Sequence, residues 1–263
     1  MQRQAITFFI IISVFCAYYF VKMTHFSTST AHLESEKRVV VVGTNAEYKP
    51  FSFIDEKGEI VGFDIDVMDA IAQKIDIVVN YKDLPFDALI GELLNGTIDC
   101  MIGGINPTPE RSEKVFFTHP VYANDPLVVV YQKNGKAFNG IKDLANAKVI
   151  VNEGYFADSF LSQQGDIALI RLSSNLPSDG LLALYNGQAD AFVGSKSTTL
   201  QALTQKQKAI FDYIVIDQVV EQDAFAVSKN NLILLTDINK AIKLLKSEGI
   251  IGNLTDKWFL NKW

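Results

Sequence analysis

One pattern occurs twice in this chain, and it constrains the fold more than any other feature. Residues 93–104 (LLNGTIDCMIGG) and residues 184–195 (LYNGQADAFVGS) align without a gap. Each copy is typical of a helix that ends at Asn-Gly, followed by an aspartate, a buried strand and a glycine. The pattern predicts two α/β lobes built on one plan, each with a glycine at the carboxyl end of a strand, where open α/β sheets bind ligands. Because Asn-Gly before a strand is common, chance similarity between two turns is the alternative.

The remaining chain alternates between apolar runs and amphipathic stretches. Strands are expected at residues 38–43, 100–103, 127–131, 148–151 and 213–216. Helices are expected at 64–74, 85–94, 142–145, 180–185 and 196–204, and through a helical tail at 234–263 that places Ile238, Ala241, Ile242, Leu244 and Leu245 on one side. Strands that alternate with helices predict parallel sheets covered on both faces.

The residues after the first copy predict a site for an anion. Gly103 and Gly104 leave the backbone accessible to a ligand. Thr108 is a typical N-cap and Pro109 a typical first helical residue, so free amides and the positive end of a helix dipole are expected near Arg111. An arginine adds a planar fork that matches a carboxylate. The alternative is a strand, a turn and a surface arginine.

The first residues predict export from the cytoplasm. Residues 5–21 are almost entirely apolar, with Arg3 before them and Lys22 after them, as in a signal peptide or a short membrane anchor. Small residues at 29–31 offer a cleavage site, although they lie some distance beyond the apolar run. Cys16 follows Phe15, where a lipidation signal requires a small residue, so lipidation is not expected.

Composition excludes several classes of function. The formal net charge is −6 at pH 7 and no basic stripe is present, so nucleic acid is not an expected partner. Cys100 is the only cysteine outside the export segment, which predicts no internal disulfide. His25, His32 and His119 are scattered, and no spacing suggests a metal site. Neither a phosphate loop nor a nucleophile elbow occurs, so no cofactor is expected.

Five segments in a fixed order resemble the bacterial extracellular solute-binding proteins of family 3, the polar amino acid receptors of ABC importers. They are residues 42–53 (VGTNAEYKPFSF), 58–66 (GEIVGFDID), 86–90 (FDALI), 99–111 and 116–122 (FFTHPVY). The resemblance implies an α/β, two-lobed, periplasmic-binding-protein-like fold of type II with a hinge of two crossing strands. Lobe one would comprise residues 36–126 and 220–263, and lobe two residues 127–219. Residues 1–35 would be a signal peptide or membrane anchor plus a linker.

The resemblance also implies a ligand site. Arg111 would bind the ligand's α-carboxylate with help from Asn106, and a carbonyl around Gly104 would accept from the α-ammonium. Tyr48 and Phe86 would stack on the ligand side chain, although Phe86 could equally belong to the core. The full set of implied ligand contacts is Asn45, Tyr48, Asp64, Phe86, Gly103, Gly104, Asn106, Arg111, Phe156 and Ser195. Asn45 and Asp64 would reach the far end of the ligand, or else cap a turn and a helix.

Lobe two departs from the family pattern at two positions. Phe156 stands where many relatives carry a hydroxyl, and Ser195 stands where relatives often carry the aspartate that binds the ligand's ammonium. Three acids could substitute for that aspartate: Glu153, Glu221 and Asp223. Each could equally be a solvated loop charge, and a slip of one residue in the alignment is a further explanation.

The function implied is a monomeric periplasmic receptor that delivers an amino acid to an ABC permease in the inner membrane. Asn45 in place of an acid disfavours arginine or lysine, whereas Asp64 could serve a cation and the aromatic residues suit a guanidinium. One alternative is a periplasmic cyclohexadienyl dehydratase, which uses the same fold and a carboxylic general acid. Tyr155 and Phe156 fit the substrate of such an enzyme. Gln222, however, stands where the general acid would align. Another is a ligand sensor tethered by an uncleaved N-terminal segment.

Overall fold

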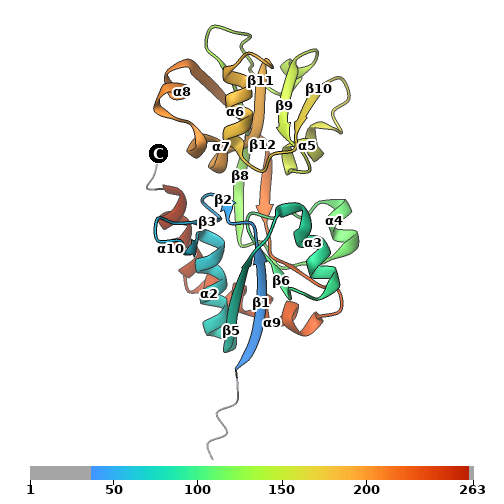
Figure 1. Cartoon of the computed structure of the whole chain (residues 1–263), viewed down its shortest axis with the longest axis vertical. Helices are drawn as coiled ribbons and strands as arrows, with labels where there is room; N and C mark the ends of the chain where they lie inside the picture. The colour runs from blue at the N-terminus through green and yellow to red at the C-terminus, as the bar shows by residue number, and fades with distance from the viewer. Residues whose placement is uncertain (1–36, 261–263) are drawn as a thin grey trace, which may run out of the picture. The chain divides into compact units, whose positions relative to one another are not determined.

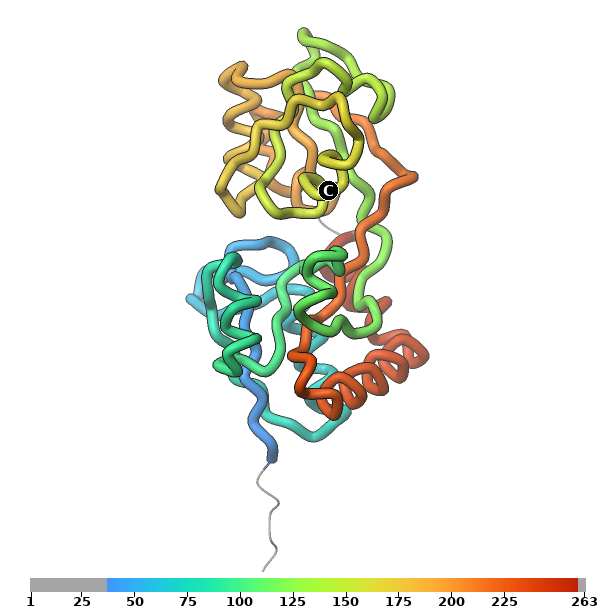
Figure 2. Tube along the Cα trace, turned by 90° about the vertical axis from the view of Figure 1, so that its right-hand side faces the viewer, coloured from blue at the N-terminus to red at the C-terminus, as the bar shows by residue number. Residues whose placement is uncertain are grey.

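The computed structural model describes residues 37–260, of which residues from Arg38 onward form one compact unit. This unit consists of two α/β lobes joined by two long strands (Figure 1 and Figure 2). The predicted signal peptide or anchor lies outside the described residues. Within residues 37–260, no helix combines the length and the apolar character needed to cross a bilayer.

Lobe one is built on a five-stranded sheet with the strand order β5-β1-β6-β13-β7. Its strands are β1 (Arg38–Thr44), β5 (Ile77–Asp83), β6 (Cys100–Met101), β7 (Phe116–Phe117) and β13 (Ala226–Val227). A small second sheet contains β2 (Glu47–Tyr48), β3 (Ser52–Ile54) and β4 (Ile60–Val61). The helices are α2 (Phe63–Ile75), α3 (Phe86–Asn95), α4 (Pro109–Lys114), α9 (Leu232–Ser247), α10 (Ile250–Thr255) and a π-helical turn, η2 (Asp256–Leu260).

Lobe two is built on a sheet with the order β10-β9-β11-β8-β12. Its strands are β8 (Tyr122–Gln132), β9 (Lys148–Asn152), β10 (Ala168–Leu172), β11 (Ala191–Ser195) and β12 (Phe211–Asp223). The helices are a 3-10 turn, η1 (Ile141–Leu144), and α5 (Phe156–Leu161), α6 (Pro177–Tyr185), α7 (Lys196–Ala202) and α8 (Gln205–Ile210). Strands β10, β9 and β11 are parallel, whereas β8 and β12 run against their neighbours.

The two connecting strands confirm the predicted hinge. β8 pairs with β12 in antiparallel register from Gln132 opposite Phe211 to Tyr122 opposite Asp223, with irregularities on either side of Glu221. One strand enters lobe two and the other leaves it, so they run in opposite directions. Both sheets are therefore mixed, and the expectation of purely parallel sheets was wrong. The same reversal continues into lobe one, where β13 is antiparallel to β6 and β7.

The duplicated pattern has the same structure in both lobes. Each helix is followed by a glycine with a positive φ, and each aspartate then precedes the third strand of its sheet. The Asp99 carboxylate accepts a 2.9 Å hydrogen bond from the amide of Val41 on β1. The Asp190 carboxylate accepts a 2.8 Å bond from the amide of Lys148 on β9. The similarity in sequence thus reflects the same aspartate-to-amide hydrogen bond, which joins neighbouring strands in each lobe.

Each lobe has its own apolar core. In lobe one, the buried face of α9 packs with α2 and the sheet, and it contributes Ile238, Ala241, Ile242 and Leu245. Leu244 was predicted on that face but is 51% exposed, because it lies next to Leu245 and successive helical residues point about 100° apart. Lobe two buries residues such as Val129 and Val149 on one face of its sheet and Val128 and Phe192 on the other.

Candidate functional site between the lobes

The loop after β6 is held in place by a buried carboxylate of α2. Asp64 is 1% exposed, and its Oδ2 accepts hydrogen bonds from the amides of Gly103 and Gly104, both at 2.8 Å. Burial raises the pKa of Asp64 to about 6, while these two amides oppose that rise. Gly62, not Asp64, occupies the N-cap of α2. The observed hydrogen bonds of Asp64 position the loop, and its contact with a ligand stays a prediction.

Two glycines are required in this loop. Gly103 and Gly104 have φ values of +114° and +68°, a region that residues with a Cβ rarely adopt. A Cβ on Gly104 would lie 2.6 Å from Cε1 of Tyr48, which is far closer than van der Waals contact. The loop therefore passes directly beneath the Tyr48 ring.

Arg111 lies at the start of α4, as the sequence predicts. Thr108 is the N-cap, and its Oγ1 accepts from the Arg111 amide at 3.2 Å, with Pro109 as the first helical residue. The guanidinium donates from Nη1 to the Asn106 carbonyl at 3.2 Å and from Nη2 to the Gly154 carbonyl of lobe two at 2.9 Å. Burial lowers the pKa of Arg111. Among residues 37–260, no carboxylate oxygen lies within 4 Å of the guanidinium, so its charge is available to an anionic group.

Three aromatic rings from both lobes lie beside Arg111. Tyr155 of lobe two stacks on Phe86, with ring centroids 4.8 Å apart, and it lies 5.5 Å from the Tyr48 ring. The Arg111 guanidinium lies 5.3 Å from the Phe86 centroid. Tyr48 is 6% exposed, and its hydroxyl lies 3.5 Å from Oγ1 of Thr198 across the cleft. The predicted rings Tyr48 and Phe86 thus come together with Tyr155.

Charges of both signs lie near the aromatic group formed by Tyr48, Phe86 and Tyr155. Burial raises the pKa of Tyr155, the charge of Arg111 lowers it, and the smaller effects of Asp87 and Glu47 raise it. Both acids belong to the elements that carry the neighbouring rings, since Glu47 precedes Tyr48 and Asp87 follows Phe86. A ligand side chain beside these rings would therefore meet the charge of Arg111 as well as those of the two acids.

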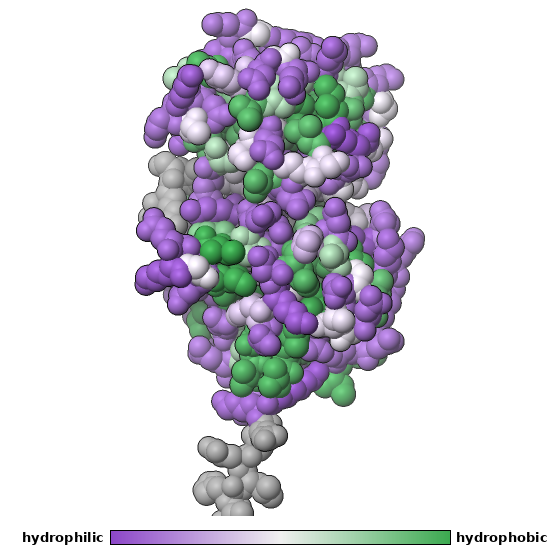
Figure 3. Space-filling model, in the orientation of Figure 1, coloured by the Kyte–Doolittle hydropathy of each residue, from purple (hydrophilic) through white to green (hydrophobic). Residues whose placement is uncertain are grey.

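Lobe two contributes hydroxyl groups and a small cavity. A narrow space of about 10 Å³, room for roughly one water molecule, lies between Tyr48 and the ends of β9 and β11, and is lined also by Asn152, Tyr155, Ser195, Thr198 and Thr199. The side-chain oxygens of Tyr155 and Thr199 are buried, and neither has a hydrogen-bond partner among the described residues. Such atoms normally bond to water or ligand. The surface is hollowed between the lobes on the side of α3 and α4 (Figure 3).

Phe156 and Tyr155 are neighbours in the sequence but have different surroundings in the structure. Phe156 is the first residue of α5, stacks with Phe160 at 6.3 Å and packs against the core of lobe two. Tyr155, one residue earlier, is the ring that meets Phe86. On the sequence alone, Tyr155 has a role only in the dehydratase alternative and is absent from the implied ligand contacts, although its position in the turn before a helix was a usable signal. Ligand contact by Phe156 remains untested.

The remaining predicted residues occupy the walls of the cleft. Asn45 is 5% exposed and donates from Nδ2 to the Leu84 carbonyl at 3.3 Å, which ties the loop after β1 to the start of α3. Asn106 donates from Nδ2 to Oδ1 of Asp223 at 2.8 Å. Ser195 donates from Oγ to Oε1 of Glu221 at 2.6 Å.

The three acids that could substitute for the missing aspartate differ in burial. Glu153 is exposed and accepts from the Ser173 hydroxyl at 2.9 Å, so it belongs to the surface. Glu221 and Asp223 are 4% and 2% exposed, and their hydrogen-bond partners are the predicted site residues Ser195 and Asn106. Burial, followed by the charge of Asp125, raises the pKa of Glu221 to about 8. Burial, followed by the charge of Glu221, also raises the pKa of Asp223.

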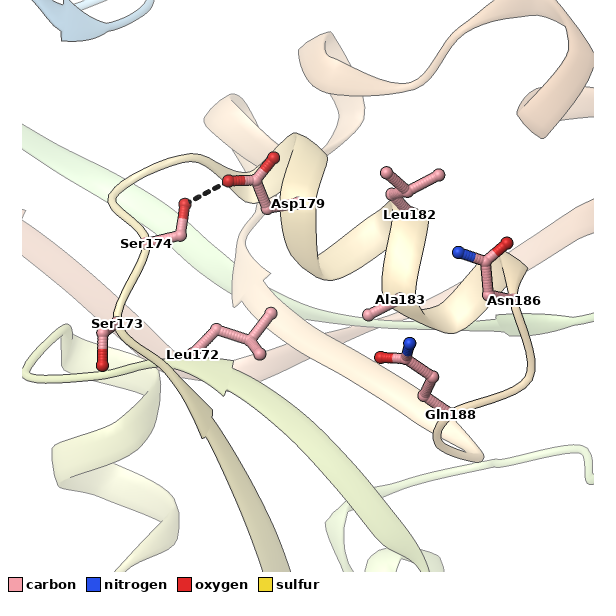
Figure 4. A pocket seen from close by; sticks show the side chains of 8 residues that line it. All are labelled: Leu172, Ser173, Ser174, Asp179, Leu182, Ala183, Asn186 and Gln188. Carbon is pink, nitrogen blue, oxygen red and sulfur yellow. Dashed lines mark hydrogen bonds between the residues drawn. The ribbon is translucent and has the colours of Figure 1, made fainter.

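A second hollow on lobe two is unrelated to these residues. It lies between the end of β10 and helix α6 and is lined by Leu172, Ser173, Ser174, Asp179, Leu182, Ala183, Asn186 and Gln188 (Figure 4). Ser174 donates to Asp179 at 2.5 Å across its rim. Neither Arg111 nor the aromatic group reaches it, and no buried charge lines it.

Comparison with known proteins agrees with the two-lobed architecture. The family described as "Bacterial extracellular solute-binding proteins, family 3" matches residues 40–261. The putative ABC transporter arginine-binding protein 2 of Escherichia coli (strain K12) is 31% identical over 223 residues, which cover 82% of this chain and 88% of that protein.

Solved structures give the same result. An ancestral arginine-binding protein bound to arginine has a TM-score of 0.74 and 31% identity, covering 85% of this chain and 99% of that one. The ancestral amino acid-binding protein AncCDT-1, described as a precursor of cyclohexadienyl dehydratase, has a TM-score of 0.72 and 29% identity, covering 84% and 95%.

Proposed function

Because this chain belongs to the bacterial extracellular solute-binding proteins of family 3, we propose that it captures an amino acid between its lobes and delivers it to an ABC importer. The relatives named above bind amino acids, and one of them is assigned to an ABC transporter. Ligand that contacts both lobes would hold the hinge of β8 and β12 closed. Closure would then be the signal that a membrane partner reads.

The observation that carries this proposal is the position of Arg111. Its guanidinium is held by two backbone carbonyls, one from each lobe, and lacks an acidic partner within 4 Å among residues 37–260. A planar guanidinium binds a carboxylate through two parallel hydrogen bonds. The α-carboxylate of an amino acid can therefore bind at Arg111 and replace the Gly154 contact.

The aromatic group favours a flat, cationic side chain. Tyr155, Phe86 and Tyr48 supply ring faces that attract a guanidinium. Glu47 and Asp87 add negative potential beside Tyr155. Since relatives include arginine-binding proteins, L-arginine is the first ligand to test. Asn45 argues against it, because it supplies a neutral amide at a position where an acid would bind a cationic side chain directly.

A thermal-shift screen of the twenty standard amino acids and small carboxylic acids tests the function. Wild-type protein is expected to melt several degrees higher with at least one amino acid, because a ligand that binds only the folded state stabilises it. Arg111→Ala should lose this shift, whereas Arg38→Ala, which removes an exposed arginine at the start of β1, should keep it. A shift that survives Arg111→Ala would contradict the assignment.

The family places the protein outside the cytoplasm, and we propose a periplasmic, monomeric receptor that serves an inner-membrane permease. The mass of the protein purified from its native host distinguishes a cleaved signal peptide from an uncleaved anchor. Sedimentation with and without ligand determines whether it is monomeric.

One observation favours an enzymatic alternative. Glu221 is a buried acid with a raised pKa close to Arg111, which is the environment of a general acid acting on a carboxylate substrate. AncCDT-1 is described as a precursor of such an enzyme. Loss of prephenate or arogenate on incubation with the purified chain, absent with Glu221→Gln, would establish a dehydratase.

A further inference from the structure

Two carboxyl groups face each other across the hinge. Glu221 on β12 is the register partner of Asp125 on β8, and the two residues are 4% and 2% exposed. Residues directly opposite on antiparallel strands project from the same face, with Cβ atoms about 5 Å apart. No lysine or arginine nitrogen within residues 37–260 lies within 4 Å of either carboxyl. Two such groups ionise together only at a high cost in free energy.

The two acids have different partners. Asp125 is bound to the start of α7, where the amide of Ser197 donates to Oδ1 at 2.9 Å and its hydroxyl donates to Oδ2. Glu221 instead accepts from Ser195, which ends β11 and lines the cleft cavity. Asp125 is therefore held by α7, whereas Glu221 is joined through Ser195 to the cavity between the lobes.

Glu221 is also close to the groups that bind a ligand. Burial lowers the pKa of Arg111 and the charge of Glu221 opposes that change, while burial, followed by the charge of Glu221, raises the pKa of Tyr48. The charged or titratable groups that face Glu221 are Asp125 from β8, Asp223 from its own strand, Arg111 from α4 and Tyr48 from β2. Those that face Asp125, besides Glu221, are Lys196 from α7, Tyr122 from its own strand and Asp223. The described acids do not form a cluster able to hold a metal ion.

We infer that Glu221 binds the ligand's α-ammonium, and that arrival of this ammonium expels a proton from the Glu221–Asp125 pair. The inference rests on the proposed function and specifies the ligand as one that carries both a carboxylate and an ammonium. Ser195 has no charge, and the longer glutamate side chain from β12, the strand beyond β8 in the sheet, supplies the missing carboxylate. Arg111 and Glu221 then bind the two ends of one zwitterion.

Electrostatic interactions explain why a proton is released when the ligand binds. Before binding, burial and then the charge of Asp125 keep a proton on Glu221, because they raise its pKa to about 8, while burial raises the pKa of Asp125 to about 6. A cation beside Glu221 favours the ionised form. The neutral carboxyl therefore becomes a carboxylate paired with the ammonium, and its proton passes to solvent. Affinity must fall as the pH is lowered, since protons compete with the ligand.

Isothermal titration calorimetry between pH 6 and pH 8 tests this coupling, in buffers of different ionisation enthalpy that reveal the number of protons released. The probes are L-arginine and argininic acid, which has a hydroxyl in place of the α-ammonium. If the screen identifies another amino acid, that amino acid and its α-hydroxy analogue take their place. Glu221→Gln keeps the shape of the side chain, and Glu153→Gln is the matched control because that acid is exposed.

Wild-type protein is expected to release up to about one proton and to lose up to about tenfold in affinity for each pH unit below pH 8. Glu221→Gln should bind the amino acid about 10- to 100-fold more weakly at pH 8, with neither proton release nor the pH slope. Argininic acid should show little difference between the two proteins. Asp125→Asn should move the pH dependence to lower pH, because it removes the repulsion that raises the pKa of Glu221.

The outcomes separate this inference from the proposed function. Equal binding by wild type and Glu221→Gln at every pH, with binding lost in Arg111→Ala, would overturn the role of Glu221 and leave the receptor function intact. A protein that binds no amino acid at any pH would overturn both. An unchanged melting temperature of Glu221→Gln without ligand, or a higher one, shows that weaker binding does not come from misfolding.

Discussion

Arg111 donates a 2.9 Å hydrogen bond to the Gly154 carbonyl and so joins the start of α4 in lobe one to the turn before α5 in lobe two. The guanidinium is positioned by neutral carbonyls, which leave its charge uncompensated. A ligand carboxylate can replace the Gly154 carbonyl as an acceptor, because a charged acceptor forms a stronger hydrogen bond than a neutral one. In the proposed binding mode, this contact is the one through which ligand binding would act on the closure of the lobes.

Arg111→Lys is expected to weaken amino acid binding by at least tenfold. A lysine keeps the positive charge but cannot form two parallel hydrogen bonds to a carboxylate or stack its head group on Phe86 in the same way. Titration calorimetry measures the loss, with Arg38→Lys as the control for a change at an exposed arginine. Unchanged affinity in Arg111→Lys would show that charge alone is sufficient.

Tyr155→Ala is expected to weaken ligand binding, whereas Phe156→Ala is expected to lower the stability of the protein. Tyr155→Ala removes the ring that meets Phe86 and should weaken binding of a flat or cationic side chain about tenfold. Phe156→Ala removes a ring packed on the lobe-two core and should lower the free energy of unfolding by about 2 kcal/mol. Ligand titration and urea unfolding of both variants check this, and the reverse result would place Phe156 in the site.

Asp64→Ala is expected to destabilise lobe one by about 2–4 kcal/mol. The substitution leaves the buried amides of Gly103 and Gly104 without an acceptor. Asp64→Asn retains one side-chain oxygen and should cost less. Urea unfolding measures both effects, and a loss of stability no greater in Asp64→Ala than in Asp64→Asn would show that these hydrogen bonds contribute little.

Without ligand, stability is expected to fall as the pH rises from about 4.5 to about 8. Glu221 titrates near its ordinary value in the unfolded chain and at about 8 when folded, so the folded state binds more protons across this window. Glu221→Gln should reduce the slope and gain up to a few kcal/mol at pH 8. Some slope should persist, because the folded-state pKa values of Asp64 and Asp125 are also raised, to about 6. Thermal melts across pH 4–9 check the sign, and a slope unchanged by Glu221→Gln would contradict it.

Short sequence patterns predicted much of the fold, because features such as helix starts are set by residues that lie close together in the sequence. The Thr108-Pro109 start of α4 follows from backbone capping within one turn of helix. The duplicated segments and the two-strand hinge are also present as predicted. Strand direction was not predicted correctly, because it depends on the order in which the chain crosses between the lobes and not on any local pattern.

By itself, the sequence determined that two similar α/β lobes form and that a glycine loop places Arg111 at a strand end. Only the tertiary structure decided which side chains meet in the cleft. Tyr155, not Phe156, stacks on Phe86, because Tyr155 is the extended N-cap residue before α5 whereas Phe156 is the first helical residue and packs on the lobe-two core. Glu221 reaches the end of β11 because antiparallel pairing in the hinge places residues far apart in sequence on one face, opposite Asp125.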